Sequence, residues 1–461
     1  MPGPYGEDGR CERGFSAVGQ IGNLRPSGTR PGAADTCQRW RERGSRQEGA
    51  PGCEHDEKMK GEVSRPITNR PQIANLPHAL AGHLGIGYHR LMAASARRFS
   101  RRSFLVAGLA GTRLAAQGLK GTTFPSDWQR YSDPATEMDV YRLTGPAYSS
   151  TMPAYYNRAI ARSSGWMLFC CDRAGSPQAF HMDLKSGETR QLTEAAELDG
   201  ASIALLPDDR SFCYFAGRSL HIANLATLRE RKLYEIPEGW DRGAGMSVSP
   251  DGTHAAFTER RGAGWRLRMV ALSHGAARTV LEAPVEMGDP IERPRRAQIL
   301  YRQAEEALWL VDSDGKQNRR LKLAAGRVAA ANWAPDGKTI LYLNIPEDRT
   351  QLNAIREYAP DTASDQLVAT TSQFATFGFN RDTSVFVGAS GNAASPDVLI
   401  LLRVTRRELT LCEHQASHPE SVAPVFAPDS QRIYFQSDRD GKPAIYCVHV
   451  EKLVEKTATT A

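Results

Sequence analysis

The sequence predicts an all-β protein: a seven-bladed β-propeller of four-stranded antiparallel blades, preceded by a disordered leader. Two observations predict this class. A polar turn recurs roughly every 41–48 residues, which is the period of one propeller blade. Short apolar or alternating stretches follow each turn, as expected of antiparallel strands with one buried face. A two-sheet sandwich or a solenoid is the alternative, although a sandwich would not keep so regular a long period.

The first 91 residues form the predicted leader. They are rich in Gly, Pro, Arg and polar residues and show little hydrophobic periodicity. Such a composition cannot bury a core, so we predict that this leader is disordered. A different pattern begins at Met92. We therefore infer that Met92 is the biological start and that residues 1–91 are an over-extended reading frame.

Residues 92–121 resemble a twin-arginine signal peptide. Arg101 and Arg102 precede an apolar stretch at 104–109, and small residues follow near Ala115. This order of basic, apolar and small residues predicts export of the folded protein to the periplasm. Because Arg113 interrupts the apolar region, a chance basic-then-apolar stretch is the alternative. The propeller is then expected to span 122–461.

The basic charge of the chain belongs to this N-terminal part. Residues 1–121 hold 19 Lys/Arg and 10 Asp/Glu, a net charge of +9. Subtracting these from the totals of 58 and 52 leaves 39 basic and 42 acidic residues, a net charge of −3. A nucleic-acid-binding body would carry a basic surplus of its own, so no nucleic-acid partner is predicted. The sequence contains no stretch of about 18 apolar residues, so no transmembrane helix is predicted.

The repeated turns locate the blades. The clearest copies are Pro-Asp-Gly turns, in which Pro pre-sets φ, Asp caps the turn locally and Gly accepts the left-handed position. The seven turn positions are 163–165, 206–209, 249–252, 292–295, 334–337, 380–382 and 427–430. Strands are predicted at 307–312, 340–343, 433–435 and 444–448.

The eight cysteines lack the spacing of a metal site or a disulfide framework. Five of them lie in or beside apolar strand-like runs, where a cysteine most often acts as a small buried hydrophobic residue. These five are Cys170, Cys171, Cys213, Cys412 and Cys447, whereas Cys11, Cys37 and Cys53 lie in the leader.

The Pro-Asp-Gly blades are similar to TolB-type, WD40-like propellers, a likeness at the level of the fold alone. Longer stretches are more specific. They include Tyr-Tyr-Asn-Arg at 155–158, Gly-Asp-Pro-Ile-Glu-Arg-Pro at 288–294, and the runs at 172–180 and 435–446. Together these stretches resemble the oligogalacturonate lyase family over about residues 130–452.

This resemblance implies a lyase that cleaves short galacturonate oligomers by β-elimination. The family uses a divalent metal, typically manganese, to neutralise the uronate carboxylate, and a histidine base to remove the C5 proton. Arginines hold the anionic sugar by bidentate contacts. Arg293 matches the family's arginine, and Arg302 and Asp289 are expected on the same face, so these three residues are the predicted substrate-binding set. For Arg293, a surface or inter-blade ion pair is an equal alternative.

The match fails at the residues that carry the family's chemistry. Asp289 stands where the family has a metal-binding histidine, and Ser421 and Ala423 stand at two further histidine positions. The base position is occupied by Ala330. Alanine can neither remove a proton nor bind a metal, and serine is a poor ligand for a divalent ion. We therefore do not assign the catalytic residues.

A remnant of the metal site is the most that the residues predict. Asp289 and His418 are candidate metal ligands, to which Glu420 can add a carboxylate. The alternatives are a turn-forming aspartate before Pro290 and a solvated loop histidine. Manganese or another divalent ion is thus implied by the family, but we do not expect it to be bound.

Two functions remain open. The first is a polysaccharide lyase that acts on pectin-derived uronate oligomers. The second is a non-catalytic propeller that binds an acidic carbohydrate, or a protein partner, at its axial face. Four aromatic residues can either stack on a sugar or fill the blade interfaces: Tyr155, Tyr156, Trp309 and Trp333.

Overall fold

The computed structural model of the chain describes residues 118–304, 307–348 and 350–456. The predicted leader at 1–91 and most of the predicted signal peptide lie outside the described residues, as do Cys11, Cys37 and Cys53. Among the described residues, no helix has both the length and the apolar character needed to cross a membrane.

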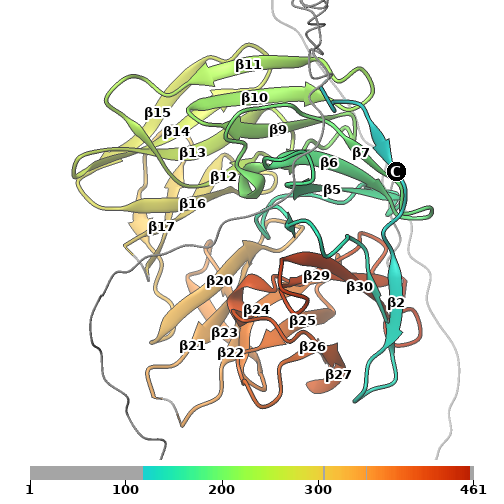
Figure 1. Ribbon diagram of the computed structural model, residues 1–461. Coiled ribbons are helices and arrows are strands. Elements are labelled where there is room, and N and C mark those ends of the chain that lie inside the picture. Colours follow the sequence, from blue (N-terminus) through green and yellow to red (C-terminus); the bar gives the residue numbers. More distant parts are fainter. Residues whose placement is uncertain (1–117, 305–306, 349, 457–461) are drawn as a thin grey trace, which may run out of the picture. The chain divides into compact units, whose positions relative to one another are not determined.

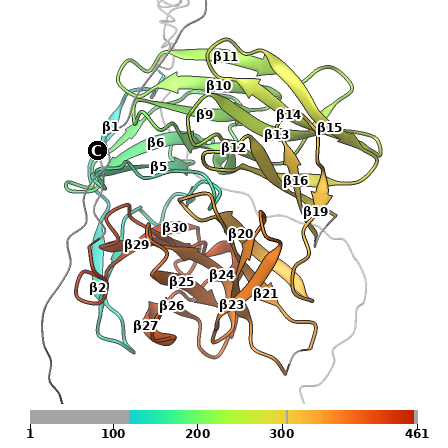
Figure 2. The ribbon, with the colours of Figure 1, turned by 180° about the vertical axis from the view of Figure 1, so that it is seen from behind.

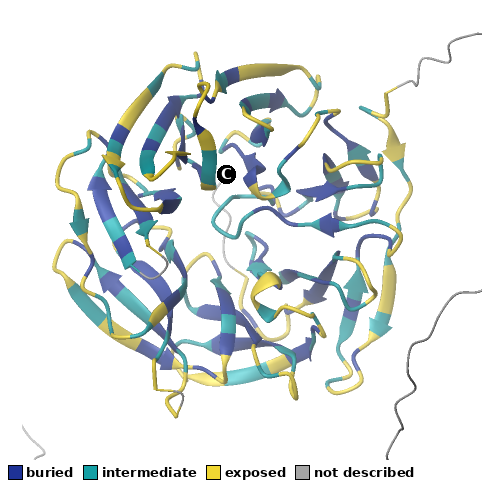
Figure 3. Ribbon diagram, turned by 60° about the vertical axis from the view of Figure 1, so that its left-hand side comes forward, coloured by how far each residue is buried: buried dark blue, intermediate teal, exposed yellow. Residues whose placement is uncertain are grey.

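The described chain is all-β and radial. It contains thirty strands and two short 3₁₀ helices, η1 (Gly200–Ser202) and η2 (Pro419–Ser421). The strands form six sheets, which lie around a common centre (Figures 1 and 3). Neighbouring strands within each sheet are mostly consecutive in the chain and antiparallel. The predicted all-β propeller arrangement is therefore confirmed.

The first two sheets and the large third sheet hold the N-terminal half of the described chain. The first sheet contains β1 (Thr123–Phe124), β4 (Ser150–Thr151), β5 (Trp166–Cys171), β6 (Gln178–Asp183) and β7 (Thr189–Gln191). The second contains β8 (Ala204–Leu205), β9 (Ser211–Ala216), β10 (Ser219–Asn224) and β11 (Glu230–Glu235). The third contains β12 (Asp241–Val248), β13 (His254–Arg261), β14 (Gly264–Ala271), β15 (Ala277–Ala283), β16 (Met287–Glu292), β17 (Gln298–Gln303), β18 (Ala307–Asp312) and β19 (Arg319–Arg320).

The other three sheets hold the C-terminal half and a returning N-terminal hairpin. One contains β20 (Arg327–Trp333), β21 (Ile340–Ile345), β22 (Ala354–Ala359) and β23 (Ser364–Thr370). The next contains β24 (Phe374–Phe379), β25 (Val385–Ser390), β26 (Asp397–Leu402) and β27 (Arg407–Glu413). The last contains β2 (Gln129–Ser132), β3 (Asp139–Arg142), β28 (Val425–Phe426), β29 (Arg432–Ser437) and β30 (Ala444–His449). All four predicted strands coincide with strands of the structure.

The sheet count differs from the prediction of seven separate four-stranded blades. The eight-stranded sheet consists of two antiparallel four-stranded runs, β12–β15 and β16–β19, joined by one parallel bridge between Ala244 and Gly288. Both residues are small, so the two inner strands approach closely. A Cβ on Gly288 would lie 3.3 Å from the Cβ of Ala244. The sequence pattern does not reveal a bridge between two blades.

The ring is closed by strands from the two ends of the described chain. β3 pairs antiparallel with β30, with Val140 opposite Val448, and β2 lies beside this pair (Figure 2). Val140 and Val448 are fully buried in one cluster with Phe435 and Val387. Closure leaves β30 without a free edge, which is how a radial array protects its terminal strands.

Six of the seven predicted turns contain a residue in the left-handed region. Glycine occupies this position at Gly252 (φ 73°) and Gly337 (φ 72°). In four turns a residue with a side chain adopts φ between 53° and 62°: Ser164, Asp209, Arg295 and Ser430. At the turn predicted for 380–382 the left-handed residue is Thr383 (φ 59°), one position further on.

The core consists of clusters of apolar side chains between and within the sheets. Fully buried tyrosine and phenylalanine residues are the largest side chains in these clusters. The five cysteines of the described chain are all buried and unpaired, as predicted.

Candidate functional site

Residues 152–160, between β4 and β5, form an axial segment that contacts several sheets. The backbone N–H of Met152 donates to Gln436 Oε1 on β29 (2.9 Å), and the Tyr155 hydroxyl donates to Ala331 O on β20 (3.1 Å). Asn157 Nδ2 donates to Met246 O on β12 (2.9 Å). Sheets so far apart in the ring meet only near its axis, so this segment lies across the centre.

Three polar side chains meet beside this segment and form what we call the axial cluster: Tyr156, Asp289 and Arg302. The Tyr156 hydroxyl donates to Asp289 Oδ1 at 3.0 Å, and Arg302 Nε lies 3.4 Å from Asp289 Oδ2. Arg302 also donates to Val328 O (2.8 Å) and Ala329 O (3.1 Å) across the boundary to β20. The structure therefore brings Asp289 and Arg302 together, on the same face as expected.

The backbone at Gly245 lies very close to Asp289 and Tyr156 of the axial cluster. Asp289 adopts φ 45° and Gly245 adopts φ 80°. A Cβ on Gly245 would lie 2.7 Å from both the Asp289 Cα and the Tyr156 hydroxyl oxygen. Only glycine fits at position 245, because it has no Cβ and tolerates the left-handed region.

Tyr156 acts as a hydrogen-bond donor in this cluster. Burial raises the pKa of its hydroxyl well above the ordinary value, and the negative charge of Asp289 raises it further. The hydroxyl is therefore neutral at physiological pH and donates its proton to the Asp289 carboxylate. Burial likewise raises the pKa of Tyr155. Neither tyrosine is poised to remove a proton from a substrate.

Arg293 lies away from the axial cluster. Its side chain is 1% exposed and forms a two-pronged ion pair with Asp361 at 3.0 and 3.1 Å. Its Nε donates to Gly337 O (2.7 Å), and its guanidinium lies 4.9 Å from the ring centroid of Trp333. These contacts match the inter-blade ion pair that was the alternative prediction. Trp333 is itself buried at 4% exposure, so it fills a blade interface.

The two candidate metal ligands, Asp289 and His418, lie on different elements of the described chain, β16 and the residue before η2. His418 is exposed and precedes η2, and its backbone carbonyl accepts from Ser421 Oγ at 2.7 Å. No hydrogen bond or ion pair joins His418 to Asp289 among the described residues. Ala330 is buried in β20, and Ala423 adopts φ 42°. Glu420 is exposed.

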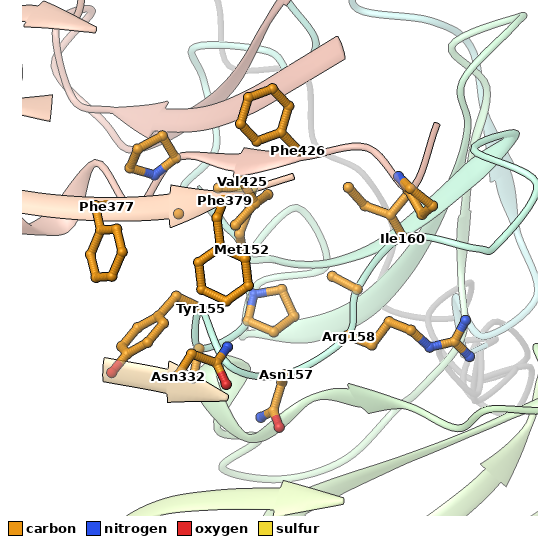
Figure 4. Close-up of a pocket in the computed structure, with 16 residues that line it drawn as sticks. Met152, Tyr155, Asn157, Arg158, Ile160, Asn332, Phe377, Phe379, Val425 and Phe426 are labelled. Atoms are coloured by element: carbon orange, nitrogen blue, oxygen red, sulfur yellow. The ribbon is translucent and has the colours of Figure 1, made fainter. Parts of the chain in front are cut away.

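A cavity of about 190 Å³ lies beside the axial segment. Its walls come from that segment and from the strands β20, β24 and β28, and most of its lining is apolar. Figure 4 shows Phe379 among the labelled side chains, with Tyr155 and Asn332 close to each other. The labelled residues are Met152, Tyr155, Asn157, Arg158, Ile160, Asn332, Phe377, Phe379, Val425 and Phe426.

Glu292 at the end of β16 is a titratable residue that the sequence pattern did not single out. Its Oε1 is buried and has no hydrogen-bond partner. Burial raises the pKa of Glu292 to about 8; the charge of Asp251 raises it further, and Arg278 opposes the shift. The sequence signal for this burial is weak, because a glutamate beside two arginines is usually solvated.

The sequence of this chain is similar to a known protein family and to two bacterial enzymes. Residues 118–267 match the family described as oligogalacturonate lyase. An oligogalacturonide lyase of Pectobacterium atrosepticum is 25% identical over 384 residues, which cover 72% of this chain and 98% of that protein. This chain is similar to the oligogalacturonate lyases. An oligogalacturonate lyase of Dickeya dadantii is 24% identical, with the same coverage.

Solved structures show the same similarity. A structure described as oligogalacturonate lyase in complex with manganese matches with a TM-score of 0.68 and 25% identity, covering 72% of this chain and 98% of that one. An oligogalacturonate lyase from Vibrio parahaemolyticus matches with the same TM-score and 23% identity, which bears on the fold alone. The resemblance predicted from the quoted motifs is confirmed.

Because that relative was solved with manganese, we asked whether the axial cluster of the present chain fits a divalent ion. Both carboxylate oxygens of Asp289 already face a donor, because Tyr156 binds one and Arg302 lies beside the other. No group of three or more His, Cys, Asp or Glu side chains able to hold a metal occurs in the described ranges. The guanidinium of Arg302 supplies the positive charge next to Asp289. The residues of this cluster therefore do not fit a divalent metal.

Proposed function

We propose that this protein acts on or binds pectin-derived uronate oligomers. The observation that carries this proposal is the match to two bacterial oligogalacturonate lyases along 98% of their length. The axial cluster holds the guanidinium of Arg302 near the centre of the ring, paired there with Asp289, and a guanidinium is the kind of group that recognises an acidic sugar.

A seven-bladed ring is part of this proposal. The seven left-handed turns divide the described chain into seven similar units. If the eight-stranded sheet is counted as two units joined by the Ala244–Gly288 bridge, then the six sheets correspond to seven blades. The closure of β3 on β30 completes the last unit.

As a lyase, the protein would break the C4–O bond of a galacturonate unit. A base removes the C5 proton, its electron pair forms the C4–C5 double bond, and the leaving oxygen takes a proton. Arg302 would stabilise the negative charge that develops beside the sugar carboxylate only by exchanging its pairing with Asp289 for the sugar. The unassigned group in this scheme is the base.

A non-catalytic binder of the same sugars is the second candidate. The observation that favours it is the saturation of Asp289 by Tyr156 and Arg302, which leaves no free base in the axial cluster. Such a protein would hold the oligomer without cleaving it.

The test is a pair of measurements on the full chain with trigalacturonate. Calorimetric titration measures binding, and ultraviolet absorbance of the unsaturated product measures cleavage, each with added manganese and with a chelator. Binding with a rise in absorbance supports a lyase, and binding without it supports the second candidate. Absence of both in every condition would contradict the proposed function.

A further inference from the structure

The cavity beside the axial segment differs chemically from the axial cluster. Among its lining residues Arg158 is the one with a charge. Its guanidinium donates to the carboxylate of Asp209 and to Leu206 O, and in Figure 4 it points away from Tyr155 and Phe377. The cavity thus offers no free cation to a ligand.

An acidic sugar unit would be disfavoured in this cavity. A uronate carboxylate that enters an apolar site loses its water and needs a charged or hydrogen-bonded partner in return. Phe377, Phe379 and Phe426 contribute apolar surface instead. The walls therefore select against a free carboxylate.

One amide side chain gives the cavity a hydrogen-bond donor. Asn332 Oδ1 accepts from the backbone N–H of Trp333 at 2.8 Å, and its amide N–H groups have no partner among the described residues. The other amide, Asn157, donates to Met246 O and Ala201 O, and in Figure 4 it points away from Phe379. A hydroxyl oxygen or an ester carbonyl oxygen can accept from Asn332.

The size of the cavity fits a ring. A cavity needs roughly 10–15 Å³ to admit one water molecule, and this one measures about 190 Å³. Aromatic walls with a few placed polar groups are typical of small-ligand sites, and aromatic side chains offer flat apolar faces to a ring.

We propose that this cavity binds an uncharged sugar ring, such as a galacturonate unit whose carboxyl group is esterified. The proposal rests on the proposed function for the class of ligand, and it adds that the cavity selects the neutral form. An ester removes the charge that the cavity cannot pair and adds a methyl group to the apolar contact with Phe379.

The test compares two ligands that differ in the charge and in the methyl groups of their carboxyl functions. Calorimetric titration of the full chain with fully methyl-esterified trigalacturonate and with free trigalacturonate gives both affinities, under a chelator to exclude metal effects. We expect the ester to bind at least about tenfold more tightly, as the desolvation of an unpaired carboxylate implies. The isosteric variant Asn332→Asp removes the free N–H donors and adds a charge, and it should lose this preference.

Phe379→Leu is the second variant and keeps the cavity lined with apolar atoms. It should weaken binding of the ester several-fold and leave free trigalacturonate unchanged. The matched control is Leu367→Ala, because Leu367 is exposed on the outer strand β23, and its affinities should equal those of the wild type. Circular dichroism verifies the fold of each variant.

The outcomes separate this proposal from the proposed function. Equal or tighter binding of the free acid by the wild type overturns the cavity proposal and leaves the proposed function standing. An ester preference that persists in both Asn332→Asp and Phe379→Leu also overturns it. Failure to bind either ligand, both with the chelator and with added manganese, would refute both proposals.

Discussion

At the scale of single residues, two ionisable side chains that are shielded from water differ in their hydrogen-bond partners. Arg293 is buried with full compensation, because Asp361, Gly337 O and Gln298 all accept from it. Glu292 is half-buried, and its buried Oε1 has no hydrogen-bond partner among the described residues. A charge that leaves water is stabilised only where partners replace that water, so burial raises the pKa of Glu292.

Arg293 and Arg296 allow the contribution of a buried arginine to be compared with that of an exposed one, because both contact the same aspartate. Both contact Asp361 Oδ1 at 3.0 Å, but the side chain of Arg293 is 1% exposed and that of Arg296 is 57% exposed. We expect Arg293→Met to lower the free energy of unfolding by about 2 kcal/mol, because the buried carbonyl of Gly337 and the half-buried side chain of Gln298 lose their donor. Arg296→Met should cost less than about 1 kcal/mol. Urea unfolding measures both, and equal costs would contradict the structural role of Arg293.

Glu292 predicts a stability that depends on pH. Its pKa in the folded protein is raised to about 8 from 4.5. The folded state therefore holds this proton more tightly than the unfolded chain does, and the contribution to stability falls as the pH rises from about 4.5 to about 8. Glu292→Gln mimics the protonated acid and avoids that loss. We expect the variant to exceed the wild type by on the order of 2 kcal/mol at pH 9 and to match it at pH 4.

Urea unfolding at the two pH values gives this comparison. Glu238→Gln is the control, since Glu238 is exposed, and it should show no difference that grows with pH. A gain for Glu292→Gln of equal size at both pH values would mean that burial of the charge is not the cause.

At the scale of elements, the feature that repeats along the chain is the turn between the first and second strands of each four-stranded run, such as β12–β13 and β20–β21. The backbone of each turn requires a left-handed residue, whether or not that residue is glycine. A side chain in this region costs roughly 1–2 kcal/mol. Turns of different sequence within this chain therefore share one backbone geometry.

Two neighbouring turns test this element. Arg295 adopts φ 62° and Gly337 adopts φ 72° at the same turn position. Arg295→Gly should raise the free energy of unfolding by about 0.5–1 kcal/mol. Glycine relieves the backbone strain of the folded state, and the greater conformational freedom of glycine in the unfolded chain offsets part of this gain. Gly337→Ala should lower it by 1–3 kcal/mol, because its Cβ would lie 2.3 Å from Pro294 O. Thermal unfolding of both variants checks the opposite signs.

At the scale of the whole molecule, the ring depends on pairing between distant parts of the chain. β3 and β30 come from opposite ends of the described chain, and Tyr141 stands opposite Cys447 in their ladder. Antiparallel partners lie about 4.5–5.5 Å apart between their Cα atoms, which a disulfide can span.

Tyr141→Cys should therefore lock the ring with the native Cys447. A link that closes so long a loop is expected to raise the free energy of unfolding by about 3 kcal/mol. The same variant under a reducing agent is the control, because it carries the substitution without the bond. Equal stability of the oxidised and reduced forms would show that this closure does not limit unfolding.

Much of the fold follows from local sequence. The turns at 249–252 and 334–337 are recognised by Pro-Asp-Gly chemistry, and strands such as Ala307–Asp312 by their apolar runs. Part of the axial site could also be predicted, since Asp289 and Arg302 were expected on one face and do meet. The partner of Arg293 could not, because Asp361 lies 68 residues away and no local pattern links the two.

By itself, the sequence determined the all-β class, the positions of the seven turns, the burial of five cysteines and the kinship with the oligogalacturonate lyases. These features depend on the order of residues within a turn or strand, or on motifs that are contiguous in the chain. Tertiary structure alone decided that the axial segment crosses the ring, that Arg302 neutralises Asp289, and that the neighbouring cavity lacks a free charge. Such features arise where residues from several blades meet at the axis, and the balance of charge and water there depends on distances that no single segment contains.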